Sequence, residues 1–443
     1  MISRAIILLS LCFIFLSTSA QLTVSADKHF LQYKNGKPFF WLGDTAWELF
    51  HRLNREEAMV YLKNRADKGF TVIQAVVLAE LDGLNTPNPY GDKPLINNDP
   101  AKPNEAYFKH VDFIVNEAQK LGLTIGMLPS WGDKWNKAWG EGPEIFTPEN
   151  AGTFGEYLGR RYRNKPIIWI MGGDRNIIDD EDKEIIRSMA KGLMKGDGHS
   201  HLFTFHPQGG KSSSDFFKDD DWIDFHMSQT GHAANSPNYT YNRKNLALTP
   251  LKPHLDGEPR YEDHPNKFKP AEFGWMDDFD TRQAAYWSML TGALGHTYGN
   301  HNIWQMYSPD KKPVNGARTK WRVALDHPGS YQVGYMRQLL QTYPWYKLVP
   351  DQDLVKSDNP EDQNYRTAAI AKDSTFALVY IPYGQPILVK TEKLGRQLSA
   401  AWFNPRDNST IPIEQFQNSG EKNFTPPSIG RGSDWVLILK NKP

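Results

Sequence analysis

Two acidic residues about eighty positions apart each follow an apolar run that is typical of a buried strand. Asp174 ends the run PIIWIMGGD, and Glu258 ends the run KPHLDGE. In a (β/α)8 barrel, the residues at the C-terminal tips of the strands form the active site. Two carboxylates in one cleft are the minimum needed to split a glycosidic bond. The spacing therefore predicts a catalytic pair, Asp174 and Glu258, with Glu262 as the alternative to Glu258.

The residues around each acid support this placement but allow a second interpretation. Gly172 and Gly173 let the backbone turn sharply before Asp174, and Pro259 keeps Glu258 out of the α region. An Asp after Gly is also a common turn or helix-cap residue, and Arg260 could hold a glutamate in a plain salt bridge. A catalytic acid would need a raised pKa, which apolar walls or a neighbouring carboxylate can supply.

Polar and aromatic residues recur after the other expected strands. Asp, His and Gln can bind sugar hydroxyls, while Trp and Tyr stack on sugar rings. Each residue taken alone is more often structural, so the prediction depends on their repeated placement at one end of successive strands. The expected substrate-binding residues are Asp44, Trp47, Trp131, Asp133, Arg175, His206, His226, Gln229, Glu262, Tyr298 and His301.

Short apolar segments alternate with helical ones along most of the chain. This alternation predicts an α/β fold, a (β/α)8 TIM barrel over residues 21–346 with an N-terminal strand extension and a hairpin turn at Asn35-Gly36. The expected barrel strands are 38–44, 69–77, 123–128, 167–171, 201–205, 222–226, 254–256 and 293–298. The expected helices are 55–68, 105–121, 148–163, 181–194 and 281–290.

After residue 346 the pattern changes to β-like runs separated by Gly, Pro, Asn and Asp. These runs lie at 367–371, 375–381, 397–403 and 435–439, and they predict a β-sandwich domain over residues 347–443. We expect this domain to pack against the barrel, with Trp402 and Phe403 as core or interface residues.

The first twenty residues have the organisation of a secretory signal peptide. One Arg precedes an apolar run, and small polar residues follow up to Ala20. We therefore expect a bacterial protein that is exported to the periplasm or secreted, with no membrane attachment after cleavage. Anchoring through Cys12 as a lipoprotein is the alternative, but Leu11 stands where a small residue is needed. Cys12 is the only cysteine, so the mature chain would have no thiol.

Composition and motifs exclude several other classes of function. Lys plus Arg and Asp plus Glu both number 51, so no basic field favours nucleic acid. His226, His232 and His254 lack the spacing of a metal motif. The glycine pairs match neither a phosphate loop nor a dinucleotide fingerprint, and no G-x-S-x-G elbow is present. We expect a monomer that needs no metal and no cofactor.

Three segments carry a family resemblance. Residues 35–47 (NGKPFFWLGDTAW), 169–174 (WIMGGD) and 256–262 (DGEPRYE) resemble the apiosidases of glycoside hydrolase family 140. The resemblance covers about residues 22–346. The tail, with 401–407 and 434–439, is similar to the small C-terminal β-domain that accompanies such barrels and that family descriptions label collagen-binding.

The resemblance implies a retaining glycosidase in which Asp174 is the acid/base and Glu258 the nucleophile. Many members of the same clan carry Asn-Glu after the fourth strand, where this chain has Gly-Asp. The implied reaction cleaves apiose–galacturonate linkages and releases side chains from the pectin rhamnogalacturonan II. The partner would then be an acidic plant cell-wall oligosaccharide or polysaccharide, and Arg175, Arg260 and Lys134 are candidates to line the cleft.

Two alternatives remain open at this stage. Another glycosidase of the same barrel clan would share Asp174 and Glu258 but act on a different plant glycan. A non-catalytic carbohydrate- or matrix-binding protein would instead carry its function in the β-domain.

Overall fold

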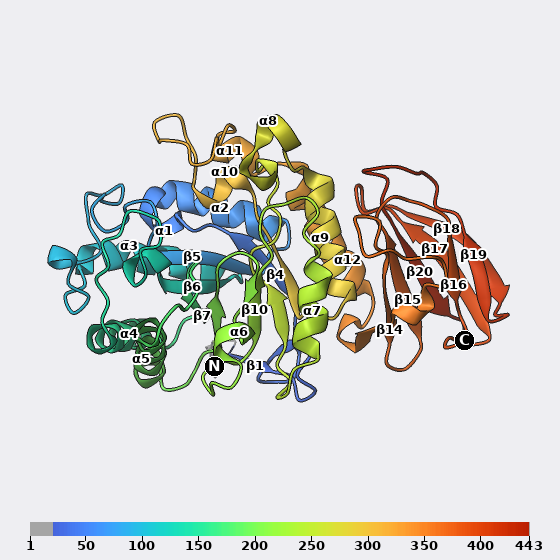
Figure 1. Ribbon diagram of the computed structural model, residues 1–443, viewed down its shortest axis with the longest axis horizontal. Helices are drawn as coiled ribbons and strands as arrows, with labels where there is room; N and C mark the ends of the chain where they lie inside the picture. The colour runs from blue at the N-terminus through green and yellow to red at the C-terminus, as the bar shows by residue number, and fades with distance from the viewer. Residues whose placement is uncertain (1–20, 443) are drawn as a thin grey trace, which may run out of the picture.

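Eight parallel strands form a closed barrel in the computed structural model, which describes residues 21–442. The expected signal peptide lies outside these residues. Hydrogen bonds join six strands in the order β12-β4-β5-β6-β7-β8, and β10 pairs with β11. Contacts of β8 with β10 and of β11 with β12 close the ring, which confirms the expected (β/α)8 architecture (Figure 1). The barrel strands are β4 (Trp41–Thr45), β5 (Val72–Leu78), β6 (Thr124–Ser130), β7 (Ile167–Gly172), β8 (Phe203–His206), β10 (His226–Gln229), β11 (His254–Asp256) and β12 (Gly295–Tyr298).

Helices cover the outside of the barrel and begin where the sequence supplies caps. Asn54 and Glu57 form a capping box at the start of α2, and Thr147 and Asn150 form another at the start of α4. The longer helices are α2 (Arg55–Asp67), α3 (Glu105–Lys120), α4 (Pro148–Tyr162), α5 (Asp180–Asp197), α7 (Asn238–Leu246), α9 (Asp278–Leu290) and α12 (Pro328–Thr342). The short ones are α1 (Leu49–Arg52), α6 (Ser214–Phe217), α8 (Pro270–Phe273), α10 (His301–Trp304) and α11 (Trp321–Ala324). No helix within residues 21–442 is both long and apolar enough to span a membrane.

The sixth barrel strand begins four residues later than the apolar pattern predicts. Trp222, Ile223 and Phe225 are buried, but they belong to the segment that leads into the strand. Ladder pairing starts at His226, whose backbone N–H donates to the carbonyl of Pro253 at 2.8 Å. The apolar run therefore predicts which residues are buried, but the start of β10 depends on where backbone pairing begins.

The N-terminal extension closes the bottom of the barrel. It forms a small antiparallel sheet of β1 (Leu22–Val24), β2 (Leu31–Tyr33) and β3 (Pro38–Phe39). The expected single strand is thus two strands, and the predicted hairpin turn at Asn35-Gly36 joins β2 to β3. Leu22, Leu31 and Phe39 join the core cluster inside the barrel.

Side chains alternate between the two faces of each barrel strand, and this alternation decides which residues reach the cleft. Val72, Ile170 and Leu255 belong to the cluster inside the barrel. Ile73 and Trp169 belong instead to the cluster between strands and helices. Toward the C-terminal ends of the strands, the inner cluster ends in tryptophans, which form part of the cleft wall described below.

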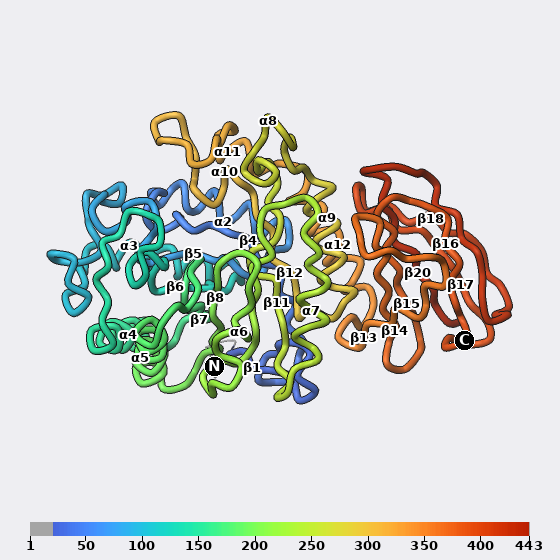
Figure 2. Tube along the Cα trace, in the orientation of Figure 1, coloured from blue at the N-terminus to red at the C-terminus, as the bar shows by residue number. Residues whose placement is uncertain are grey.

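The C-terminal residues form a separate antiparallel β-domain that lies beside α9 and α12 (Figures 1 and 2). One sheet has the order β13-β14-β15-β20-β17-β18, and β16 pairs with β19. Residues of both sheets make up one core cluster, as in a sandwich. The strands of this domain are β13 (Leu348–Pro350), β14 (Thr367–Ala371), β15 (Phe376–Ile381), β16 (Ile387–Lys390), β17 (Gln397–Phe403), β18 (Thr410–Gln417), β19 (Glu421–Phe424) and β20 (Trp435–Asn441). The remaining strand, β9 (Lys211–Ser212), belongs to the barrel region and pairs with β10.

Buried contacts join the barrel and the β-domain. Arg282 of α9 donates from Nη2 and Nε to the two carboxylate oxygens of Asp434, at 2.9 and 3.1 Å. The rings of Tyr286 and Tyr380 stack with centroids 4.7 Å apart. Trp402 and Phe403 are buried, Trp402 within the sandwich and Phe403 in the cluster shared with the barrel.

Candidate active site

A cleft of about 450 Å³ lies at the C-terminal ends of the barrel strands. Both predicted carboxylates line it, and each lies two residues beyond the end of its strand. The cleft is the place where a barrel of this kind presents its chemistry. Its lining is made by Trp47, Glu80, Trp131, Trp139, Asp174, Gln208, Gly209, Gln229, Gly231, His232, Glu258, Tyr261, His264, Phe268, Trp304, Val314 and Asn315.

The backbone turns sharply to deliver Asp174. Gly172 and Gly173 have φ values of 91° and 104°, and Asp174 itself has φ 55°, a region that L residues other than Asn and Asp rarely adopt. A Cβ at Gly172 would come within 2.5 Å of the carbonyl oxygen of His206. The turn therefore depends on glycine at this position, and it holds the Asp174 carboxylate against the cleft.

His206 fixes the relative positions of the two acids. Its Nδ1 accepts a hydrogen bond from the backbone N–H of Asp174 at 3.2 Å. The ring proton must then lie on Nε2 when the imidazole is neutral. Nε2 is 3.0 Å from Oε2 of Glu258, although the angle departs from that of a well-formed hydrogen bond.

Glu258 is held as an anion by two imidazoles. In addition to the His206 contact, Nε2 of His232 lies 3.1 Å from Oε1 of Glu258. Burial alone would raise the pKa of Glu258, but the hydrogen bonds and charges of the two histidines outweigh it and lower the pKa to about 2. The His232 ring is stacked on His264, with centroids 4.3 Å apart. Glu258 is therefore an ionised carboxylate at any ordinary pH.

Asp174 has the opposite electrostatic environment. Burial, followed by the negative charge of Glu258, raises the pKa of Asp174 to about 6. Nη1 of Arg175 is 3.7 Å from Oδ2 of Asp174 and offsets only part of this effect. One acid is thus ready to donate a proton near neutral pH while the other is charged. Environments that push two pKa values apart in this way assign the acid and base roles in glycosidases.

A third carboxylate, Glu80, also lines the cleft and was missed by the sequence analysis. It lies two residues after the end of β5, the same position relative to its strand that Asp174 and Glu258 occupy. Burial, followed by the charge of Asp174, raises the pKa of Glu80 to about 8. Among the described residues its carboxyl group has no ion pair within 4.0 Å. Its position after a buried strand was the signal that could have identified it.

Tryptophans form the walls of the cleft. The rings of Trp47 and Trp131 lie 5.2 Å apart at 52°, and Trp47 meets His206 edge-on at 5.4 Å. Trp304 donates from Nε1 to Nδ1 of His301 at 3.3 Å. Flat apolar rings beside paired carboxylates suit the C–H faces of a sugar.

The structure brings together eight of the predicted site residues and places the other five elsewhere. Those that line the cleft are Trp47, Trp131, Asp174, Gln229 and Glu258. Three more support its lining through direct contacts, namely His206, Arg175 and His301. The remaining five predicted residues also do not line it, and these are Asp44, Asp133, His226, Glu262 and Tyr298.

Strand alternation explains Asp44 and Tyr298, and local pairing explains Glu262. Oδ2 of Asp44 accepts hydrogen bonds from Tyr61 and Arg65 of α2, both at 2.6 Å, so its side chain faces the helices. Tyr298 pairs with Asp44 in register on the neighbouring strand and faces the same way. Its hydroxyl donates to Glu262, which also accepts the backbone N–H of Gly329 at 3.1 Å. Glu262, the alternative nucleophile, therefore makes structural hydrogen bonds outside the cleft.

Asp133 and His226 also have structural partners. Asp133 is buried, pairs with Lys134 at 2.7 Å and accepts the backbone N–H of Gly142. His226 is the first residue of β10, at the end of the strand away from the cleft, and contacts Ser213 at 3.1 Å.

The three cations expected to face an acidic substrate are all engaged elsewhere. Lys134 pairs with Asp133, and Arg260 is buried and donates to Gln283 and to the carbonyl of Ala234. Arg175 is buried beneath Trp139, with its guanidinium carbon 3.6 Å from the ring centroid. Arg175 therefore positions a wall of the cleft and has its charge directed at Asp174.

Over residues 21–442, no group of three or more His, Cys, Asp and Glu side chains has the arrangement of a metal site. The histidines nearest the carboxylates are instead occupied by Glu258 and by one another.

Comparison with known families assigns the barrel. A family described as "Apiosidase-like, catalytic domain" matches residues 25–347. The chain belongs to the apiosidase-like family. A second family, described as "Putative collagen-binding domain of a collagenase", matches residues 349–440 of the β-domain. A comparison with curated proteins found no match.

Two solved structures of glycoside hydrolases are similar to this chain over nearly its full length. A protein named glycoside hydrolase is 32% identical with a TM-score of 0.87, over 96% of this chain and 97% of that one. A glycoside hydrolase family 5 protein from Bacteroides vulgatus ATCC 8482 is also 32% identical with a TM-score of 0.87, over 96% of this chain and 93% of that one. This member of the apiosidase-like family is therefore a glycoside hydrolase.

Proposed function

We propose that the protein is a retaining apiosidase that cleaves apiose–galacturonate linkages and releases side chains from the pectin rhamnogalacturonan II. The observation that carries the proposal is the pair of cleft carboxylates with opposed protonation, Asp174 with a pKa of about 6 and Glu258 with a pKa of about 2. The apiosidase-like family match over residues 25–347 supports the choice of substrate.

In the first step, Glu258 attacks the anomeric carbon while Asp174 gives its proton to the leaving oxygen. The glycosidic bond breaks, a glycosyl ester forms on Glu258, and the leaving alcohol carries the proton away. His206 and His232 hold the attacking carboxylate in place and keep it ionised. The Asp174 pKa, raised by burial and then by the negative charge of Glu258, matches this role as a proton donor.

In the second step, water replaces the alcohol. The Asp174 carboxylate, now ionised, takes a proton from the water while the water oxygen attacks the anomeric carbon. The ester bond breaks, the sugar leaves with its original anomeric configuration, and Glu258 returns as a carboxylate. The rings of Trp47 and Trp131 offer flat apolar surfaces on which the bound sugar can stack.

Product analysis tests the substrate. Rhamnogalacturonan II and its side-chain oligosaccharides are incubated with the wild-type protein, and the products are separated by mass and sugar composition. Release of a chain that ends in apiose is the expected result. If products are released only from other plant glycans, the protein is another glycosidase of the same clan and not an apiosidase. Proton NMR of the first product formed would show whether the anomeric configuration is retained or inverted.

We also propose that the protein is exported and loses residues 1–20. The N-terminal sequence of the protein recovered from the host's periplasm or medium tests this, and a chain that begins at Gln21 is expected.

A further inference from the structure

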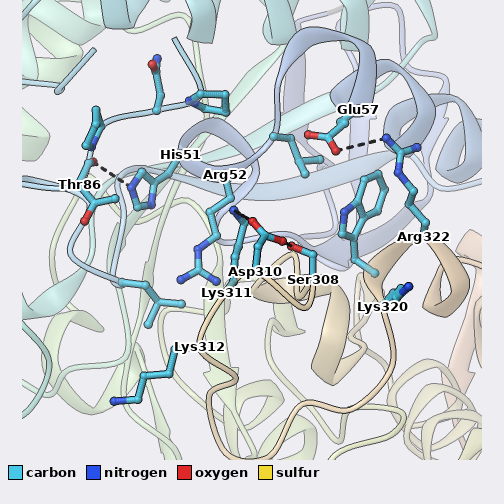
Figure 3. Close-up of a pocket in the computed structure, with 16 residues that line it drawn as sticks. His51, Arg52, Glu57, Thr86, Ser308, Asp310, Lys311, Lys312, Lys320 and Arg322 are labelled. Atoms are coloured by element: carbon cyan, nitrogen blue, oxygen red, sulfur yellow. Dashed lines mark hydrogen bonds and ion pairs between the residues drawn. The ribbon is translucent and has the colours of Figure 1, made fainter. Parts of the chain in front are cut away.

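A second cavity, of about 610 Å³, has more cations than acids among its charged lining residues (Figure 3). The positively charged residues come from α1, from α11 and from the loop between α10 and α11, and they number five against two acids. The lining cations are Arg52, Lys311, Lys312, Lys320 and Arg322, and the acids are Glu57 and Asp310. The chain as a whole has no net charge. The excess of positive charge is therefore particular to this cavity.

Three of the five cations have acidic partners, and two do not. Arg322 lies 3.3 Å from Glu57, and Lys311 lies 3.4 Å from Asp310; Figure 3 shows the first of these pairs as a dashed line. Arg52 is 3.6 Å from the buried Glu48. Lys312 and Lys320 are exposed, and neither makes an ion pair within 4.0 Å to any residue in the described range. These two ammonium groups are therefore available to an anionic ligand.

A buried amide adds an unsatisfied donor to the same cavity. Oδ1 of Asn88 accepts the backbone N–H groups of Tyr90 and Asp92, at 2.9 and 3.1 Å. These bonds fix the orientation of the amide, so Nδ2 must face the other way. Asn88 is 3% exposed, and its Nδ2 has no partner among the residues described. A buried donor without a partner destabilises the folded chain, and a ligand oxygen beside Nδ2 would give it a partner.

The cavity shares its walls with the catalytic cleft. Leu81 lines the cavity and directly follows Glu80, which lines the cleft. On the other side, Lys311 and Lys312 line the cavity while Val314 and Asn315 line the cleft, all within one loop.

Buried hydrogen bonds brace both shared walls. Oε1 of Glu48 accepts the backbone N–H of Leu81 at 3.1 Å, and Oε2 contacts His51 at 2.6 Å. Gln305 donates to the carbonyl of Val314 and accepts its backbone N–H in return, within one braced loop. A glycan seated in the cleft could thus continue over a fixed edge into the basic cavity.

We propose that this cavity is a subsite for carboxylate-bearing sugars, uronic acid residues of the glycan that lie beyond the cleaved bond. Lys312 and Lys320, which Figure 3 shows on opposite sides of the cavity, would each attract a carboxylate of the glycan, and Thr86, Asn88 and Ser308 offer polar groups for the hydroxyls. The proposal deepens the proposed function, since it rests on a glycan occupying the cleft. It also explains how an acidic substrate is accommodated although Lys134, Arg175 and Arg260 are engaged elsewhere.

Isothermal titration calorimetry with trigalacturonate tests the subsite directly, without requiring turnover. The test variant is K312A/K320A, and the control is K109A/K191A, which removes two exposed lysines of α3 and α5. We expect the test variant to bind about tenfold more weakly than the wild type, which corresponds to about 1.4 kcal/mol. The control should bind as the wild type does, and binding should weaken with salt. A charge reversal, K312E/K320E, should abolish the binding.

Two ligand controls separate a uronate from other anions. Fully methyl-esterified trigalacturonate has the same rings without the charge and should fail to bind to the cavity. Inorganic phosphate should compete only weakly. Equal binding of trigalacturonate by the wild type and K312A/K320A, or binding of phosphate with the same lysine dependence and no saccharide binding, would overturn the proposal.

The outcome is separable from that of the proposed reaction. Release of apiose-terminated chains together with unchanged trigalacturonate binding in K312A/K320A would reject the subsite and leave the apiosidase standing. Lysine-dependent trigalacturonate binding with no release from rhamnogalacturonan II would support the subsite and reject the apiosidase.

Discussion

Replacing Asp434 by Asn tests whether the β-domain stabilises the barrel. Asp434 is fully buried and receives two hydrogen bonds from Arg282 of α9, at 2.9 and 3.1 Å, and one from the hydroxyl of Tyr380 at 3.1 Å. Asn has the same shape but no charge, so the variant leaves the Arg282 guanidinium buried with less compensation. Arg406, 3.6 Å from Asp434, loses the same partner.

The size of the effect follows from these contacts. Breaking a buried ion pair by removing one partner costs about 3–5 kcal/mol. We take the lower value, about 3 kcal/mol, because Arg282 keeps Asp278 and Gln332 as partners. At about 2.1 cal/mol/K per residue, a chain of about 420 residues that unfolds as one unit has an unfolding entropy near 0.9 kcal/mol/K. The melting temperature should then fall by about 3 °C.

Differential scanning calorimetry measures this change and also reports how the two domains unfold. If the β-domain unfolds alone, its roughly 95 residues carry only about 0.2 kcal/mol/K, and its own transition should fall by about 15 °C. The matched control is Asp353→Asn, whose side chain is 82% exposed in the same domain. A melting temperature for Asp434→Asn within 1 °C of that control would refute the interface as a stabilising element.

Three further predictions concern the cleft. The Asp174 pKa of about 6 and the Glu258 pKa of about 2 predict that kcat/KM is highest between these pH values. It should fall as pH rises through about 6, because Asp174 then loses the proton that it donates. A fall near pH 8 would instead identify Glu80, whose pKa is about 8, as the proton donor. Glu80→Gln retains the shape of the protonated carboxyl and should leave kcat within about threefold of wild type, whereas Asp174→Asn should lower it by about 10²–10⁴-fold; equal losses in steady-state assays would contradict the assignment. His206→Ala removes a contact that lowers the pKa of Glu258, so the acidic limb of kcat/KM should move to higher pH with little change in KM, and an unmoved limb would show that His206 does not hold the anion.

The placement of the proposed catalytic pair could be predicted because it depends on local pattern. Buried parallel strands are recognisable as continuous apolar runs, and the residues just beyond them must meet at one end of the barrel. Asp174 and Glu258 satisfy this rule, and so does Glu80, which was overlooked although Ala79-Glu80 follows an apolar run of the same kind.

Other features depend on side-chain direction and distant partners, which the apolar pattern does not contain. Asp44 is the penultimate residue of β4 but faces α2, because alternate residues of a strand face opposite sides. Glu262 is only four residues from Glu258, yet its partners come from β12 and α12. The basic cavity likewise combines residues from 51 to 322 and exists only in the folded chain.

The most direct test of the account is to find the residue that carries the covalent glycosyl group. Asp174→Asn, which lacks the proposed acid/base but keeps the proposed nucleophile, is mixed with an apioside that has a good leaving group. The quenched protein is digested and analysed by mass spectrometry. We predict a mass increase of one glycosyl unit on Glu258, and none in Glu258→Gln. A glycosyl group on Glu262 or Glu80, or an inverted product with no label, would contradict the central claim.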